Sequence, residues 1–509
     1  MDSLTSFIDS KFNNQADQWE KALLAELKLP EVGSKGIKKL ISGQSWPTLS
    51  LSSAHSVQLT SSSWKKASTT YVSVSLDLLA EDLANGVRNF FFHSEGLVDG
   101  VWEQVEKLLK NSSHPKELDV FILGGGDYKS ESINVITDFI SGDEFHREGG
   151  HSVHELALAS KKLAQAASSV KDVVYLGVYV DSHFFHNIAK IRAAKLLGQK
   201  ILEEAGKQCE LKVIALTSYM GWTLYERYSN MLRNETAVAS AYIGGADHVQ
   251  SSGYNTLLEL ESSDAVESRH QERSLRMARN TSHILALESL LGVVEDASFG
   301  SFHLENLTQH LCEESWKLMQ ELLQGKNLAD DISTVKDRRL EMMKTRKTVL
   351  SGINDYPDVK EKLGLKLKAP SFFRVARIFE ELRLKMENLP VRPQVYVALY
   401  GDYAALNARL NFAKNYFELL GLEVRERGNS LLDIEQFKKD LSSRQEDIIV
   451  LCAADDSYPL LSDLGNLVKT EHKYIAGKFE MASFTNLFAG QNIYEVLKNL
   501  VSLFERRSP

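Results

Sequence analysis

The stretch that decides the fold runs from VVYLGVYV at residues 173–180, through HNIAKIRAAKLLGQKILEEAG at 186–206, to KVIALTS at 212–218. The first and third segments are short, apolar and β-branched, which is typical of buried strands. The middle segment has a helical apolar stripe, and we expect its lysines on the opposite face. The stripe consists of Ile188, Ile191, Leu196 and Leu197. A strand, a helix and a second strand in this order predict parallel strands joined by a right-handed crossover.

The same alternation continues on both sides of this unit. Further strands are expected at 87–93, 119–125 and 239–250, and a further helix at 152–170. The whole region, residues 66–345, has a length that favours a (β/α)8 TIM-like barrel over two open sheets. The fold class predicted for this part of the chain is therefore α/β with a parallel barrel.

The flanking regions have different patterns. Residues 1–65 combine an amphipathic helix at 17–27 with a polar Gly/Ser-rich stretch, which predicts an arm lying on a partner subunit. Residues 346–390 form a linker that ends in a helix. From 391 to 509, apolar strands alternate again with helices, which predicts a flavodoxin-like doubly wound domain with its boundary near Leu389.

Bulk properties exclude several classes of protein. The chain has 509 residues, a formal net charge of -9 and three cysteines that lie far apart without a CxxC pair. The acidic balance gives no general attraction to nucleic acid or to anionic membranes. The N-terminus lacks a signal-peptide pattern, and no stretch is apolar enough to span a bilayer. We therefore expect a cytoplasmic protein that binds neither nucleic acid nor membrane.

Three blocks, at 189–197, 221–250 and 274–311, resemble corresponding stretches of the methylmalonyl-CoA mutase family in order and spacing. The matching residues are Ala278-Arg279-Asn280-Thr281, Glu288, Asp296, Gly300-Ser301 and Leu307-Thr308, with Ala297 in place of a proline. An interpretation without chemistry is also open, in which Arg279 and Asn280 form a surface pair that ties a helix to the barrel. The resemblance then implies the fold but no activity.

The resemblance also implies that the cofactor site of the family is missing from this chain. Catalytic subunits hold cobalamin with a D-x-H-x-x-G motif, in which the histidine is the lower axial ligand. At the equivalent strand end this chain has Asp402 and Tyr403, followed by Ala404, Ala405 and Leu406. A tyrosine or an alanine cannot supply the imidazole. We therefore expect no cofactor bound by this chain and regard Asp402 and Tyr403 as a degenerate motif.

The substrate side departs from the family in the same way. Ile214, Leu216 and Ser218 stand where catalytic subunits carry an arginine, a histidine and a glutamine. His146 is similar to the family histidine that binds the thioester carbonyl, and we expect it to be vestigial, without a catalytic role. No catalytic residue is therefore expected.

Two further patterns are weighed and set aside. Paired histidines could bind a metal, but no acidic or cysteine ligand accompanies them at a recognisable spacing, so no metal site is expected. These histidines are His146, His151, His154, His183 and His186. The glycine-rich turn at 122–128 lacks the remaining residues of a P-loop.

Taken together, the resemblance implies the non-catalytic small subunit of a heterodimeric, adenosylcobalamin-dependent methylmalonyl-CoA mutase. Its partner would be a homologous catalytic large subunit, which holds adenosylcobalamin and interconverts (R)-methylmalonyl-CoA and succinyl-CoA. Two alternatives remain open. One is an active mutase with a divergent cofactor site, and the other is a stand-alone CoA-ester-binding or scaffold protein.

Overall fold

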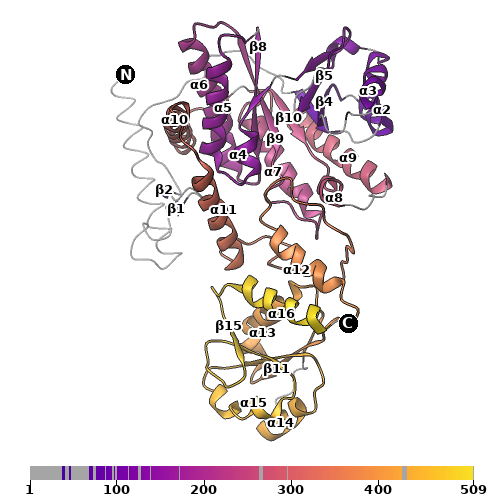
Figure 1. Cartoon of the computed structure of the whole chain (residues 1–509), viewed down its shortest axis with the longest axis vertical. Coiled ribbons are helices and arrows are strands. Elements are labelled where there is room, and N and C mark those ends of the chain that lie inside the picture. The colour runs from indigo at the N-terminus through magenta and orange to yellow at the C-terminus, as the bar shows by residue number, and fades with distance from the viewer. Residues whose placement is uncertain are drawn as a thin grey trace.

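The computed structural model shows two α/β domains stacked along the long axis of the molecule and joined by α11 and α12 (Figure 1). The structure describes residues 37–39, 45–47, 68–72, 76–85, 87–93, 97, 100–112, 114–123, 128–137, 139–170, 172–262, 268–294, 296–426 and 433–507. Within the predicted arm, only β1 (Ile37–Lys39) and β2 (Ser45–Pro47) are described, and they pair antiparallel. The helix predicted at 17–27 and most of the glycine-rich turn at 122–128 lie outside the described residues.

The first domain is built on an eight-stranded parallel sheet. Its strands are β3 (Ser68–Val72), β4 (Asn89–His93), β5 (Asp119–Leu123), β6 (Asn134–Ile136), β7 (Ile140–Ser141), β8 (Val173–Val180), β9 (Glu210–Thr217) and β10 (His248–Ser251). Their order is β6-β5-β4-β3-β10-β9-β8-β7. The first strand, β3, pairs with both β4 and the last strand, β10, as barrel closure requires. The two ends of the sheet, β6 and β7, are consecutive in the chain.

The helices follow the strands less regularly than an eightfold repeat predicts. The main helices that follow strands of the first sheet are α2 (Leu76–Ala84), α3 (Val101–Lys110), α5 (Ser152–Ala166), α6 (Phe184–Glu204), α7 (Ser229–Ile243) and α9 (Ser268–His283). Among the described residues, no helix separates β5 from β6 or β6 from β7. The strand predicted at 239–250 is wrong over most of its length, because α7 continues to Ile243 and only His248–Ser251 is extended. A run of alanine, serine and tyrosine suits a helix packed on a sheet as well as it suits a strand.

Helix α6 is buried on nearly all sides, which corrects the prediction for its lysines. Ile188, Ile191 and Leu197 are buried as predicted, but Lys190 and Lys195 are buried as well. The cause is that α5, α7 and α10 (Phe302–Leu323) all pack against α6. Carboxylates on neighbouring elements compensate both ammonium groups, as buried charge requires.

The interior of the first sheet is filled with bulky side chains. Phe91 stacks on Phe121 with ring centroids 5.0 Å apart, and Tyr175 meets the Phe121 ring edge-on at 5.5 Å. Ile214 and Leu216 complete the same buried cluster. This is the packed interior that the aromatic strands predict.

The second domain is a five-stranded parallel sheet with helices on its faces. Its strands are β11 (Val395–Tyr400), β12 (Val424–Glu426), β13 (Ile448–Ala453), β14 (His472–Ala476) and β15 (Thr485–Leu487), in the order β12-β11-β13-β14-β15. Its helices are α13 (Tyr403–Glu418), α14 (Ile434–Ser442), α15 (Leu464–Leu467) and α16 (Ile493–Arg507). This 2-1-3-4-5 order is consistent with a flavodoxin-like domain. The predicted alternation of strands and helices is present from β11 to α16.

A buried ion-pair cluster fastens the two domains together. Arg374, which is fully buried, donates to Glu261 at the end of α8 (Thr256–Glu261) at 2.6 and 2.8 Å. It also donates to Glu380 in α12 (Arg377–Glu387) at 2.6 Å and to the Trp222 carbonyl at 3.0 Å. One apolar core then runs from Tyr225 in the first domain through α11 (Ala329–Lys344) and α12 to the second sheet.

Candidate functional site

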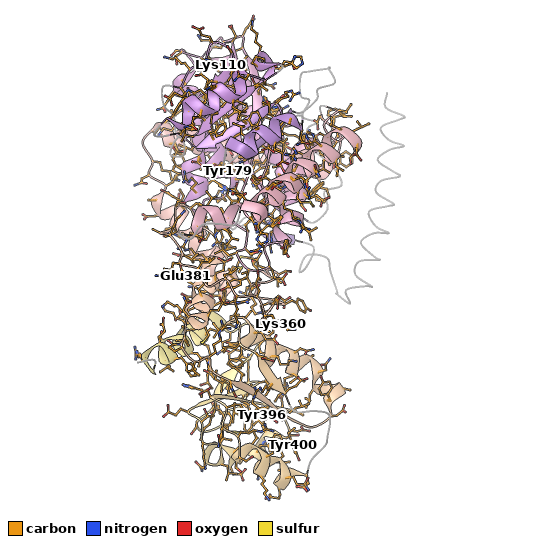
Figure 2. All side chains as sticks on the ribbon, turned by 90° about the vertical axis from the view of Figure 1, so that its right-hand side faces the viewer. Lys110, Tyr179, Lys360, Glu381, Tyr396 and Tyr400 are labelled. Atoms are coloured by element: carbon orange, nitrogen blue, oxygen red, sulfur yellow. The ribbon has the colours of Figure 1, made fainter. Side chains whose placement is uncertain are left out.

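Functional side chains in parallel α/β proteins gather at the carboxyl ends of strands, and β7 and β8 carry such a group. Strand β7 leads into α4 (Asp143–Arg147), which holds His146. The His146 ring stacks on Tyr179 of β8, with centroids 4.1 Å apart and planes 3° from parallel. The Tyr179 hydroxyl donates to Asp143 Oδ1 at 2.5 Å. Figure 2 shows Tyr179 inside the first domain, far from Tyr400 at the end of β11 in the second.

The centre of this group is a buried ion pair. Glu155 of α5 accepts from Lys190 Nζ at 2.6 Å and from the Tyr179 backbone N–H at 2.7 Å. His146 Nδ1 lies 3.4 Å from the same carboxylate. Burial opposes ionisation of Glu155, but Lys190 and His146 together hold the pKa of its carboxyl below the usual range. His146 is thus engaged with the chain's own residues.

Two other predicted histidines stack on each other at the start of α5. The rings of His151 and His154 are 3.7 Å apart, and His151 caps the helix by accepting from the Val153 N–H at 3.2 Å. Burial, followed by nearby basic groups, lowers the pKa of His151 to about 2. Burial lowers the pKa of His154 to about 4. Both rings are neutral at pH 7. No three potential metal ligands cluster anywhere in the described part of the chain.

The buried His154 makes a pH-dependent contribution to stability. Its pKa is about 4 in the folded chain against an ordinary value of 6.5, so the unfolded chain binds its proton first as the pH falls. The free energy of unfolding should therefore decrease below pH 6.5, by about 2 kcal/mol from this group at pH 5. Urea denaturation at pH 7 and pH 5 measures the difference. His154→Gln should remove this loss of unfolding free energy between pH 7 and pH 5, whereas H114Q, at an exposed histidine, should leave the loss unchanged. The same loss in both variants would contradict the assignment to His154.

The neighbouring strand, β9, carries apolar side chains beside this group. Ile214 and Leu216 point into the aromatic interior, and the buried Ser218 donates its backbone N–H to the Val180 carbonyl at 2.8 Å. No cationic side chain stands at these three positions. A substrate carboxylate in this interior would lose its hydration without gaining a partner from them.

At the end of β11, Asp402 has a structural role. It is the N-cap of α13, and its carboxylate accepts from the Ala405 N–H at 2.9 Å. Tyr403, the first residue of α13, packs against the core shared by the two domains. Both residues of the degenerate motif therefore support the helix start.

Side chains also connect the strand ends at the switch point between β11 and β13. Arg409 of α13 reaches across it and donates to the Ala453 carbonyl at 2.5 Å and to Asp455 at 2.7 Å. The buried Tyr458 donates to the Ala476 carbonyl at 2.6 Å. A corrin needs an axial nitrogen at this edge. None of these side chains supplies an imidazole, so they do not fit cobalamin.

Comparison with known proteins decides the family. A profile described as methylmalonyl-CoA mutase matches residues 128–378. A methylmalonyl-CoA mutase small subunit of Porphyromonas gingivalis is 27% identical over 361 residues, covering 65% of this chain and 55% of the relative. The corresponding small subunit of Streptomyces virginiae is 29% identical, covering 62% and 54%. Residues 128–378 belong to the methylmalonyl-CoA mutase family.

Other members of the mutase family match over less of the chain. A protein of Rhizobium meliloti named methylmalonyl-CoA mutase is 28% identical over 246 residues, which is 43% of this chain and 32% of the relative. The chain spans about half the length of the small subunits it matches. Among the described residues, no helix is both long and apolar enough to cross a bilayer.

The residues that match the mutase family pattern meet in a second buried cluster. Arg192, which is fully buried in α6, donates to Asp296 at 3.1 Å, to Thr308 at 3.0 Å and to Glu305 at 2.8 Å. Arg279 is also buried and pairs with Asp82 of α2. The interpretation of Arg279 and Asn280 as a surface pair is therefore wrong for Arg279, whereas Asn280 is exposed. The predicted tie between this helix and the barrel domain is nevertheless present, since Arg279 joins α9 to α2. The two clusters bind elements of the first domain together.

Sequence reasoning missed Tyr179, Glu155 and Lys190, which hold His146 in place. Lys190 gave no signal, because the apolar stripe of α6 does not show that three other helices cover this helix. Tyr179 gave no signal either, because the alternating pattern of a strand does not distinguish a tyrosine of the site from one of the core.

The N-cap role of Asp402 can be tested directly. Asp402→Ala should lower the free energy of unfolding by about 1 kcal/mol, because the Ala405 N–H loses its acceptor. Asp402→Asn should lower the free energy of unfolding by only a few tenths of a kcal/mol. D433A, at the matching N-cap of α14, should resemble D402A in urea denaturation. A neutral D402A would show that the carboxylate serves another purpose.

Proposed function

We propose that this chain is the non-catalytic small subunit of a heterodimeric, adenosylcobalamin-dependent methylmalonyl-CoA mutase. Its role is to bind and stabilise a homologous large subunit, which holds the cofactor and interconverts (R)-methylmalonyl-CoA and succinyl-CoA. The chain supplies a (β/α)8-type barrel and a flavodoxin-like domain as the scaffold for that assembly, in the cytoplasm.

The observation that carries the proposal is the chemistry at the end of β11. Asp402 caps a helix, Ala404 stands where the motif needs a histidine, and Arg409 binds Asp455 across the switch point between β11 and β13. The filled aromatic interior of the first sheet supports the same conclusion, because it leaves little room for a substrate along the axis. His146 is held by Glu155 and Tyr179 and takes no part in chemistry.

The test compares the chain alone with the chain produced together with the larger mutase homologue from the same organism. Each preparation is incubated with adenosylcobalamin, passed through gel filtration, and assayed for corrin absorbance and mutase turnover. We expect neither corrin nor turnover with the chain alone, and both with a stable complex of the two chains. Stoichiometric corrin on the single chain together with turnover would establish an active mutase instead. Failure to form any complex would favour a stand-alone protein.

A further inference from the structure

The first domain carries a band of exposed apolar side chains, which we call the apolar band. Three leucines in it, Leu232, Leu287 and Leu290, are 67%, 62% and 58% exposed. The full band consists of Phe185, Leu232, Met277, Ile284, Leu287, Leu290, Val294 and Phe299. Single exposed apolar residues are ordinary, but a gathering of large ones calls for an explanation.

The band lies over neighbouring elements. Helix α7 packs against α6, against α9 and against the π-helical turn η4 (Ile284–Glu288) that follows α9. Phe185 begins α6, Leu232 lies in α7 and Met277 in α9. The remaining members come from η4 and the segment that leads to α10. The members of the band therefore lie on adjacent elements of the domain.

The segment after α9 is apolar on both of its sides. Leu285, Ala286 and Leu291 pack against the core formed by α6 and α7. Between them, Leu287 and Leu290 point outward, although Leu290 needs a left-handed backbone with a φ of 55°. A π-helical turn and a left-handed leucine both cost conformational free energy. This conformation places Leu287 and Leu290 on the surface, where they make no contribution to the core.

The size of the band approaches that of a stable interface. With roughly 150–250 Å² for an aromatic side chain and less for an aliphatic one, the eight side chains at about half exposure present on the order of 600 Å². Specific interfaces bury about 800 Å² on each partner, whereas monomers rarely expose a continuous apolar patch larger than a few hundred Å².

We propose that the apolar band is the surface on which the homologous large subunit docks. This inference rests on the proposed function. All members of the band lie within residues 128–378, the region that matches the mutase family, so a homologous chain contributes the corresponding helices. Two chains of one fold can then meet through equivalent faces around a pseudo-two-fold axis, as in an isologous dimer.

The test measures binding of the large homologue to the full chain by titration calorimetry. The double variant Leu232→Glu with Leu287→Glu places two charges in the centre of the band, and its Kd should rise by at least about 100-fold. The control is Tyr356→Glu with Val391→Glu, at apolar residues that are 79% and 81% exposed outside the band, and its Kd should stay within about 3-fold of wild type. Urea denaturation of each variant alone verifies that it folds.

The outcomes separate this inference from the proposed function. If the wild-type chain binds the large homologue and the band variant binds equally well, the docking surface lies elsewhere and the proposed function stands. If the wild-type chain does not bind the large homologue at all, the proposed function itself fails. If the chain alone forms a dimer that L232E with L287E dissociates in sedimentation analysis, the band belongs to a second copy and this inference is overturned.

Discussion

Replacing Arg374 by methionine should lower the free energy of unfolding by about 3–5 kcal/mol. The guanidinium binds Glu261 and Glu380, and both carboxylates are almost completely buried. Burial opposes the charged form of Arg374, yet the two carboxylates raise the pKa of its guanidinium above the usual value. The attraction between the guanidinium and the carboxylates therefore outweighs the cost of burying the charge. Methionine fills a similar volume but leaves two acids beside each other without that cation.

The same substitution should loosen the junction between the domains. Glu380 Oε1 accepts from the Leu224 N–H at 2.7 Å and so connects α12 to the loop after β9. Urea denaturation should give a lower midpoint for R374M, and limited proteolysis should cut faster between residues 345 and 376. Adding Glu380→Gln should recover part of the loss, because it removes one unpaired charge and keeps the acceptor for Leu224.

The control uses an exposed ion pair of the same helix, α12. Lys385 of α12 and Glu505 of α16 form an exposed ion pair at 3.4 Å, and Lys385→Met should cost less than about 1 kcal/mol. If R374M were as stable as K385M, the cluster would add nothing to the junction.

Much of the fold followed from patterns of apolar residues. β8 coincides with its predicted strand, and the doubly wound second sheet follows from β11, β13 and β14. The failures have physical causes. The segment 239–250 contains residues that suit helix and strand alike, and only its tertiary contacts make α7 continue to Ile243. The short strands β6, β7 and β15 offer too few residues for a pattern to emerge.

The candidate site could be predicted from the sequence only where the family chemistry requires one particular side chain. The missing imidazole near Asp402 can be seen in the sequence, because one residue type alone can serve as the axial ligand. That Arg409 and Asp455 bind each other across the switch point cannot be seen there, since they lie on different elements, after different strands. The burial of Lys190 was missed for the same reason: an amphipathic pattern does not show how many helices surround α6.

Arg192→Met should have an effect of similar size, about 3–5 kcal/mol, because it removes a fully buried guanidinium from beside Asp296 and Glu305. Arg192→Lys should recover only part of this stability, since an ammonium cannot reproduce the fork that reaches Asp296, Glu305 and Thr308 together. Urea denaturation measures both variants. Lys200→Met, in the same helix at an exposed pair with Glu204, should change the stability by no more than about 0.5 kcal/mol.

The Arg192 cluster also fixes the segment that carries part of the apolar band. Asp296 lies between Val294 and Phe299, and Glu305 accepts from the Gly300 N–H at 3.0 Å, so the guanidinium holds both ends of this turn against α6. When R192M is measured under conditions where it remains folded, its affinity for the large homologue should therefore fall as well. R374M, whose cluster lies at the domain junction, should lose stability without losing that affinity. Equal losses of affinity in both variants would mean that general destabilisation, and not the position of the segment, weakens the complex.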